Sequence, residues 1–190
     1  KVRLLMLTVP SRSNVPQYKR LKKDTDELVG RLNSKYATVN WTPIWYYYRE
    51  MEFEDLIDLY MSSDIAMITP VRDGMNLVAK EFVATRVNQD GVLILSEMAG
   101  AFKELFDALT VNPFDLNSMA NSIFESINMP LEEQKRRNLT MQKRLSRHDV
   151  EFWAKRFFDE LQIKSRKKNK LSVSKIEKNE IIKIKKKFKK

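Results

Sequence analysis

A run of residues with the chemistry of an anion site occupies positions 69–81, Thr-Pro-Val-Arg-Asp-Gly-Met-Asn-Leu-Val-Ala-Lys-Glu. It follows a short apolar stretch that is typical of a buried strand, and it opens a segment with helical spacing. Asp73-Gly74 is a turn pair, and glycine lets the backbone approach a ligand closely. The amides of residues 75–78 then fall at a helix N-terminus, where unpaired N–H groups favour a phosphate or diphosphate.

Glu81 lies one helical turn after Leu77, on the same face of the expected helix. A carboxylate there can accept hydrogen bonds from ribose hydroxyls while the helix start binds the phosphates, so the run favours a sugar-nucleotide site. A purely structural interpretation stands beside it, because Asp-Gly is a common turn before a helix and a helical Glu is usually solvated. The sequence has no Gly-x-Gly-x-x-Gly, so the dinucleotide fingerprint is absent.

Alternating strands and helices are expected to position this run. Short apolar strands that alternate with amphipathic helices predict an α/β fold with a doubly wound, Rossmann-like parallel sheet covered on both faces. Such sheets bind ligands beyond the carboxyl ends of their strands, which is where residues 69–81 fall. The pattern predicts strands at 2–9, 44–48, 65–69, 91–95 and 109–111, and helices at 16–36, 54–62, 76–87, 103–108, from 115, from 130 and at 150–161.

The composition excludes several kinds of site. The 190 residues include no cysteine, which excludes disulfides, thiolate zinc sites and a cysteine nucleophile. The single histidine, His148, excludes a His-rich metal site and disfavours a His-dependent triad. No apolar run approaches the roughly 18 residues of a membrane span, so the expected setting is the cytoplasm.

The net charge of +10 belongs to the end of the chain. From Lys164 onward there are 13 Lys or Arg and 2 Glu, which leaves a net charge of −1 for the residues before it. The sequence therefore predicts a neutral domain at 1–161 and a basic linker or tail at 162–190. A specific nucleic-acid partner is not expected, because the domain itself carries no basic excess.

The run 69–81 resembles the donor-binding motif of trehalose-6-phosphate synthases, retaining glycosyltransferases of the two-Rossmann-domain type. The resemblance extends over about residues 1–161. It includes Pro-Ser-Arg at 10–12, Gly-Arg-Leu-Asn at 30–33, Trp-Thr-Pro at 41–43, Leu-Ser-Glu-Met-Ala-Gly at 95–100 and Val-Asn-Pro at 111–113.

The resemblance implies that UDP-glucose and glucose 6-phosphate give trehalose 6-phosphate and UDP, with retention and without a metal or other cofactor. Asp73 would be the catalytic residue and would hydrogen-bond the donor glucose, Glu81 would bind the ribose, and Met51 would contact the uracil. Arg12, which taken alone reads as a surface arginine, would bind the phosphate of the acceptor. The remaining donor contacts would come from Gly74, Met75, Asn76, Leu77, Val78, Ala79 and Lys80.

The resemblance also implies partners beyond this chain. The chain would be the C-terminal half of a larger synthase, inactive without an N-terminal half that binds the acceptor. Its basic tail resembles the connector that leads into a phosphatase domain of the haloacid-dehalogenase type in fused synthase/phosphatases. Self-association is left open.

Three alternatives differ from this interpretation. A glucosylglycerol-phosphate synthase would share the motifs and differ mainly in the acceptor. A regulatory module would keep the fold and bind sugar phosphate without catalysis, although the intact Asp73 and Glu81 argue against it. A nucleic-acid binder would use the basic tail alone. The nucleotide preference among UDP, GDP and ADP is also open, because Glu81 would contact only the ribose and not the base.

Overall fold

The computed structural model describes residues 1–11 and 14–173. These residues form two compact units, of which the first is Lys1–Ser62 and the second begins at Ser63. The division falls inside the domain predicted at 1–161, and the five strands pair as one two-stranded and one three-stranded sheet. All the pairings are parallel, as the sequence predicted.

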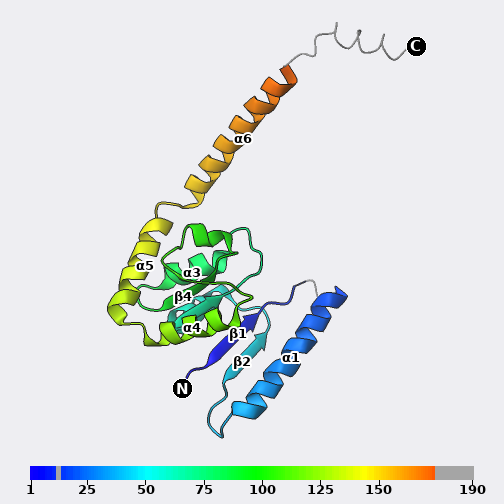
Figure 1. Cartoon of the computed structure of the whole chain (residues 1–190), viewed down its shortest axis with the longest axis vertical. Helices are drawn as coiled ribbons and strands as arrows, with labels where there is room; N and C mark the ends of the chain where they lie inside the picture. The colour runs from blue at the N-terminus through cyan, green and yellow to red at the C-terminus, as the bar shows by residue number, and fades with distance from the viewer. Residues whose placement is uncertain (12–13, 174–190) are drawn as a thin grey trace, which may run out of the picture. The chain divides into compact units, whose positions relative to one another are not determined.

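The first unit places a two-stranded sheet beside a long helix (Figure 1). Strand β1 (Leu4–Thr8) pairs with β2 (Ile44–Tyr48), so that Leu4 lies opposite Ile44 and Thr8 opposite Tyr48. Helix α1 (Pro16–Tyr36) connects them and begins with proline in its first turn, where a missing N–H costs nothing. Helix α2 (Phe53–Ser62) follows β2.

Asn33 joins α1 to β2 by a two-point contact. Its Nδ2 donates to the carbonyl of Ile44 at 3.0 Å, and the Ile44 N–H donates to its Oδ1 at 3.0 Å. The side-chain amide thus satisfies both backbone groups of the first residue of β2, as a neighbouring strand would. The same strand carries Trp45, whose ring lies 3.9 Å from the Arg3 guanidinium.

The second unit is built on the three-stranded sheet β3 (Ile65–Ile68), β4 (Val92–Ser96) and β5 (Leu109–Val111), in that order. Helix α3 (Leu77–Thr85) connects β3 to β4, and the 3₁₀ helix η1 (Gly100–Lys103) lies between β4 and β5. Three helices complete the unit: α4 (Leu116–Asn128), α5 (Leu131–Leu145) and α6 (Val150–Val173).

Both faces of this sheet are covered. Helices α3 and α4 lie on opposite sides of β4 (Figure 1), all of whose residues are buried. Because successive side chains of a strand point to opposite faces, Leu93 and Leu95 face away from the α4 side and are almost fully buried too. The second unit is therefore doubly wound, as the sequence predicted. The core on the α4 side gathers Val92, Ile94, Leu109, Val111 and Met129, with Ile65, Met67, Met119 and Ile123 packed against it.

The helix predicted at 103–108 is wrong. The chain instead forms η1 and then a turn, in which the Leu105 N–H donates to the Ala101 carbonyl. The turn begins earlier than predicted because the Gly100 N–H is already fixed by the carbonyl of Asp73, at 2.9 Å. Leu105 is fully buried there and anchors the approach to β5.

Helix α6 begins where the sequence predicted, at Val150, and continues beyond residue 161 to Val173. The boundary between domain and tail after residue 161 stays a prediction, and residues 174–190 lie outside the described part of the chain. Of the helices in that part, none combines the length and the apolar character needed to cross a membrane.

Candidate functional site

The turn after β3 is organised by the carboxylate of Asp73. The Met75 N–H donates to Asp73 Oδ1 at 3.0 Å, and Asn76 Nδ2 donates to Asp73 Oδ2 at 3.0 Å. The two carboxylate oxygens thus draw residues 73–76 into one compact turn. The turn lies beyond the carboxyl end of β3, where a doubly wound sheet places its ligands.

These contacts lower the pKa of Asp73 below its ordinary value. The hydrogen bond from the Met75 amide is the largest cause, and the side chain and amide of Asn76 add to it, while partial burial opposes them. The carboxyl group is therefore ionised at neutral pH and acts only as a hydrogen-bond acceptor.

Asn76 caps the start of α3. Its backbone is left-handed, with φ 67°, and its Oδ1 accepts the Ala79 N–H at 2.9 Å. The sequence predicted four amides for an anion here, at residues 75–78, but those of Met75 and Asn76 point to Asp73. The amides of Leu77 and Val78, at the first helical positions, have no carbonyl one turn earlier in α3 to accept them. The anion site at the helix start therefore rests on these two N–H groups.

The neighbouring loop supports this turn. Ala99, in the loop after β4, forms an isolated parallel bridge with Asp73, in the loop after β3. In this bridge the Gly100 N–H donates to the Asp73 carbonyl. Ser96 Oγ shapes the same loop by accepting the Met98 N–H at 3.1 Å. The two loops at the carboxyl ends of adjacent strands are thus hydrogen-bonded into one platform.

The other predicted donor residues on α3 have different environments. Ala79 is fully buried, and its N–H is already bonded to Asn76 Oδ1. Lys80 forms an ion pair with Glu104 at 2.5 Å, with its own side chain 19% exposed. Glu81 is half-buried and follows Leu77 by one helical turn, the position expected for a ribose ligand.

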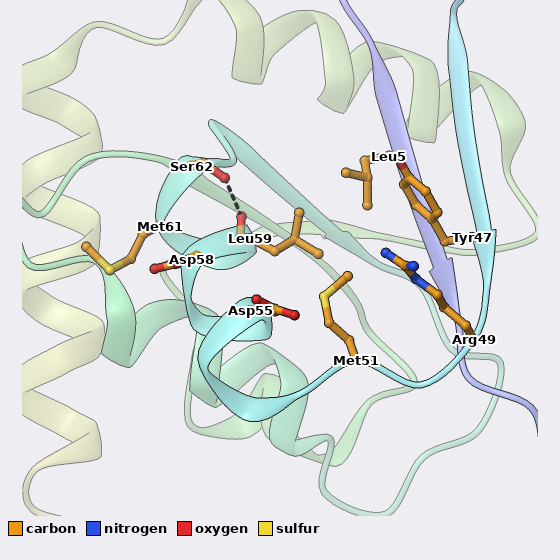
Figure 2. A pocket seen from close by; sticks show the side chains of 9 residues that line it. All are labelled: Leu5, Tyr47, Arg49, Met51, Asp55, Asp58, Leu59, Met61 and Ser62. Carbon is orange, nitrogen blue, oxygen red and sulfur yellow. Dashed lines mark hydrogen bonds between the residues drawn. The ribbon is translucent and has the colours of Figure 1, made fainter.

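Met51 lies in the first unit, on the wall of a hollow of about 640 Å³. Figure 2 shows Met51 between the strands and α2, with the side chains of Arg49 and Asp55 beside it. The hollow therefore combines an apolar thioether with groups that can donate and accept hydrogen bonds, a combination suited to a polar heteroaromatic ring. Its remaining lining residues are Leu5, Tyr47, Asp58, Leu59, Met61 and Ser62.

Arg12, the predicted ligand of the acceptor phosphate, lies outside the described residues. The sequence analysis expected Asn76 as a donor contact but missed its capping role, and it missed Glu104 altogether. An Asn directly before a helical run is an N-cap signal, and it could have assigned Asn76 its role. Glu104 gave no such signal, because its partner Lys80 is 24 residues away.

Comparison with known proteins identifies the family. The sequence profile of glycosyltransferase family 20 matches residues 1–163. The chain belongs to glycosyltransferase family 20. The bifunctional trehalose-6-phosphate synthase/phosphatase of Thermoproteus tenax is 49% identical over 153 residues, which are 80% of this chain and 21% of that protein. The glucosylglycerol-phosphate synthase of a Picosynechococcus strain is 43% identical over 84% of this chain and 32% of its own length.

Solved structures agree with this assignment to family 20. The α,α-trehalose-phosphate synthase (UDP-forming) of Burkholderia xenovorans in complex with glucose-6-phosphate matches with a TM-score of 0.82 and 37% identity, over 85% of this chain and 36% of that one. A structure from E. coli bound with UDP-2-fluoro glucose matches with a TM-score of 0.81 and 36% identity, over the same shares. The Rossmann-like α/β class is confirmed, and the chain spans between about a fifth and a third of these relatives.

Proposed function

We propose that this family 20 chain is the C-terminal, donor-binding part of a cytoplasmic retaining synthase that transfers glucose from UDP-glucose to glucose 6-phosphate, giving trehalose 6-phosphate and UDP. The observation that carries the proposal is the platform at the carboxyl ends of β3 and β4, where ionised Asp73 lies beside the N-terminus of α3. The relatives named UDP-forming trehalose-phosphate synthase support the reaction.

Each residue has a part in the proposed reaction. The Asp73 carboxylate accepts hydrogen bonds from hydroxyls of the donor glucose through lone pairs that Met75 and Asn76 leave. The amides of Leu77 and Val78 stabilise the negative charge of the departing diphosphate, and Glu81 binds the ribose. The proposed chemistry is electrostatic and uses no metal, because the N–H donors of the helix start stabilise the leaving group.

The acceptor side of the proposal lies beyond the described residues. Arg12 is proposed to bind the phosphate of glucose 6-phosphate, for which a guanidinium is well suited. The remaining acceptor contacts are proposed to come from an N-terminal half, without which the chain is expected to be inactive. The coverage of 36% of a synthase structure supports this, and the bifunctional Thermoproteus relative supports a fused phosphatase.

A second candidate reaction is glucosylglycerol-phosphate synthesis. The Picosynechococcus relative of that name is 43% identical to this chain, a level similar to several trehalose-6-phosphate synthases. Both proposals place the nucleotide sugar on the same platform, so they differ in the acceptor and share the test of the donor site.

Calorimetric titration of the chain with UDP and with UDP-glucose tests the donor site. Saturable binding of both is expected. Glu81→Ala should weaken the binding of both ligands by about tenfold, which is what the loss of a hydrogen bond to a charged group costs. Asp73→Ala should weaken mainly the binding of UDP-glucose, because UDP has no glucose for Asp73 to contact. Glu125→Ala, an exposed helical glutamate on α4, is the matched control.

Two outcomes would overturn the proposal. A chain that is folded by circular dichroism and shows no saturable binding of UDP does not hold the donor on its own residues. If Glu81→Ala lowered the affinity for UDP no more than Glu125→Ala does, Glu81 would not be part of the binding site. A thermal melt of Asp73→Ala separates a lost ligand contact from an unfolded turn.

A further inference from the structure

A second candidate ligand site lies at the C-terminal end of α5, on residues that the proposed donor site does not use. A hollow of about 400 Å³ is lined there by Thr140, Lys143, Arg144, Arg147 and His148. The first three of these residues lie three and four positions apart on one face of α5, and the last two lie in the turn that follows the end of α5 at Leu145. The hollow therefore concentrates three cations and the only imidazole of the sequence.

The cations of this hollow differ from those in the first half of α5. There, Lys135 lies 3.2 Å from Glu132, and Arg136 lies 2.7 Å from Glu133. By contrast, within residues 1–11 and 14–173 no carboxylate lies within 4.0 Å of the charged nitrogens of Lys143, Arg144 or Arg147 in an ion pair. The end of α5 thus carries three positive charges that no carboxylate of the described residues neutralises in an ion pair.

The Arg144 carbonyl at the end of α5 does not need these cations as hydrogen-bond donors. Cations commonly compensate the unpaired carbonyls at a helix C-terminus. Here the Arg144 carbonyl already accepts the N–H groups of Arg147 and His148, each at 3.1 Å, and faces His148 Nδ1 at 2.9 Å. Because a carbonyl only accepts, Nδ1 carries the proton in that contact, which leaves Nε2 for another partner.

Two of the lining groups are held in place by aromatic rings. The guanidinium of Arg144 lies 3.7 Å from the centroid of the Phe106 ring. The imidazole of His148 meets the ring of Phe152 edge-on, with 4.6 Å between centroids. These contacts restrict side chains that would otherwise lose conformational freedom on binding, so a ligand meets a partly organised site.

We propose that this hollow, which we name the α5 pocket, binds an oligophosphate group with two or more phosphates. Three cations match the three to four negative charges of a diphosphate, and arginine forms paired hydrogen bonds with phosphate oxygens. Thr140 lines the hollow but does not donate a hydrogen bond to the ligand, because its hydroxyl donates to the Arg136 carbonyl at 2.9 Å. The group can belong to a nucleotide or be inorganic, and the chemistry of recognition is the same.

His148 provides a reporter inside the site. Since it is the only histidine, its ring resonances in the NMR spectrum of the full chain are unambiguous. Addition of inorganic pyrophosphate is expected to shift the His148 ring signals saturably. The double variant Lys143→Gln/Arg147→Gln should weaken that response by at least about tenfold, because two charge-assisted contacts are lost. Both side chains are exposed, so the fold should persist.

The matched control is Lys135→Gln, which removes a cation of the same helix that has its own carboxylate partner. It should leave the pyrophosphate response of His148 unchanged. An equal loss in the control and in the double variant would show a general effect of charge and would overturn the α5 pocket. A shift that only grows linearly with added salt would do the same.

Two further titrations identify the source of the group. A saturable His148 shift with UDP assigns the pocket to nucleotides, and a shift with pyrophosphate alone assigns it to inorganic oligophosphate. A response to a long polyanion such as heparin without any response to pyrophosphate would overturn the pocket in favour of a surface for macromolecules. Because the readout is at His148, failure here is distinguishable from failure of the donor site at residues 73–81.

Discussion

A Cβ atom on Gly100 would lie 2.0 Å from the carbonyl oxygen of Gly74. No real Cβ contact is that short, so the two loops approach each other at a distance that only glycine allows. The contact lies beside the hydrogen bond from the Gly100 N–H to the Asp73 carbonyl, at 2.9 Å. The position of the Asp73 turn is therefore set by a glycine that lies 27 residues further along the chain.

Gly100→Ala is expected to displace the Asp73 turn. It should weaken the binding of UDP-glucose by more than about tenfold, because a shift of about an ångström misplaces a binding group. The neighbour that must move is backbone, so the clash cannot be relieved by a side chain. Calorimetry with UDP-glucose measures the effect. Gly30→Ala is the control, since a Cβ there meets nothing within 4 Å on α1 and alanine favours the helix. Equal affinity in the two variants would contradict the prediction.

Asn76→Ala should destabilise the second unit by about 1–2 kcal/mol, the usual value of a lost N-cap. It removes the bond to the Ala79 N–H and the bond to Asp73, and it places alanine at a left-handed φ of 67°. Asn76→Gly loses the same hydrogen bonds but tolerates that φ, so it should cost less. Urea denaturation measures both. A larger loss in the glycine variant would show that the backbone conformation is not the problem.

Much of the fold could be predicted from local patterns. The spacing of apolar residues and the position of Pro16 predicted α1 with the bounds that the structure has, and Pro43 with the aromatic run predicted β2. The helix predicted at 103–108 failed because its start is fixed from outside. Gly100 is bonded to Asp73, a contact between two loops that no local pattern contains.

The candidate site was predictable in part for the same reason. The turn at Asp73-Gly74 and the helix after it are where the sequence placed them. The number of amides available to an anion was not predictable, because a carboxylate or an amide side chain can turn back onto its own backbone. Asp73 does so here by accepting the N–H groups of Met75 and Asn76, and sequence spacing cannot say whether a carboxylate faces a ligand or its own backbone.

The contribution of Glu133 to the stability of the fold should depend on pH. Hydrogen bonds from Arg136 and then Arg137 lower its pKa from 4.5 to about 2. Because the folded pKa lies below the unfolded one, the contribution is full above pH 4.5 and is lost as the pH falls toward 2. Glu133→Gln should therefore lower Tm at pH 7, and the difference from the parent protein should shrink between pH 4.5 and 2. Thermal melts across that range measure it, and a difference that grows in acid would contradict the assignment.

Asn138 should be among the most costly polar side chains to remove. It is fully buried on α5, and its Nδ2 lies 2.7 Å from the carbonyl of Gly91 and 3.0–3.1 Å from those of Gln89, Asp90 and Gln134. Asn138→Ala removes the buried contact with the Gly91 carbonyl together with three part-buried ones, and it should cost about 2–3 kcal/mol. Asn128→Ala, which removes one exposed bond to the Phe124 carbonyl, should cost under about 1 kcal/mol. Urea denaturation compares the two, and equal losses would mean that burial adds nothing to the value of the Asn138 contacts.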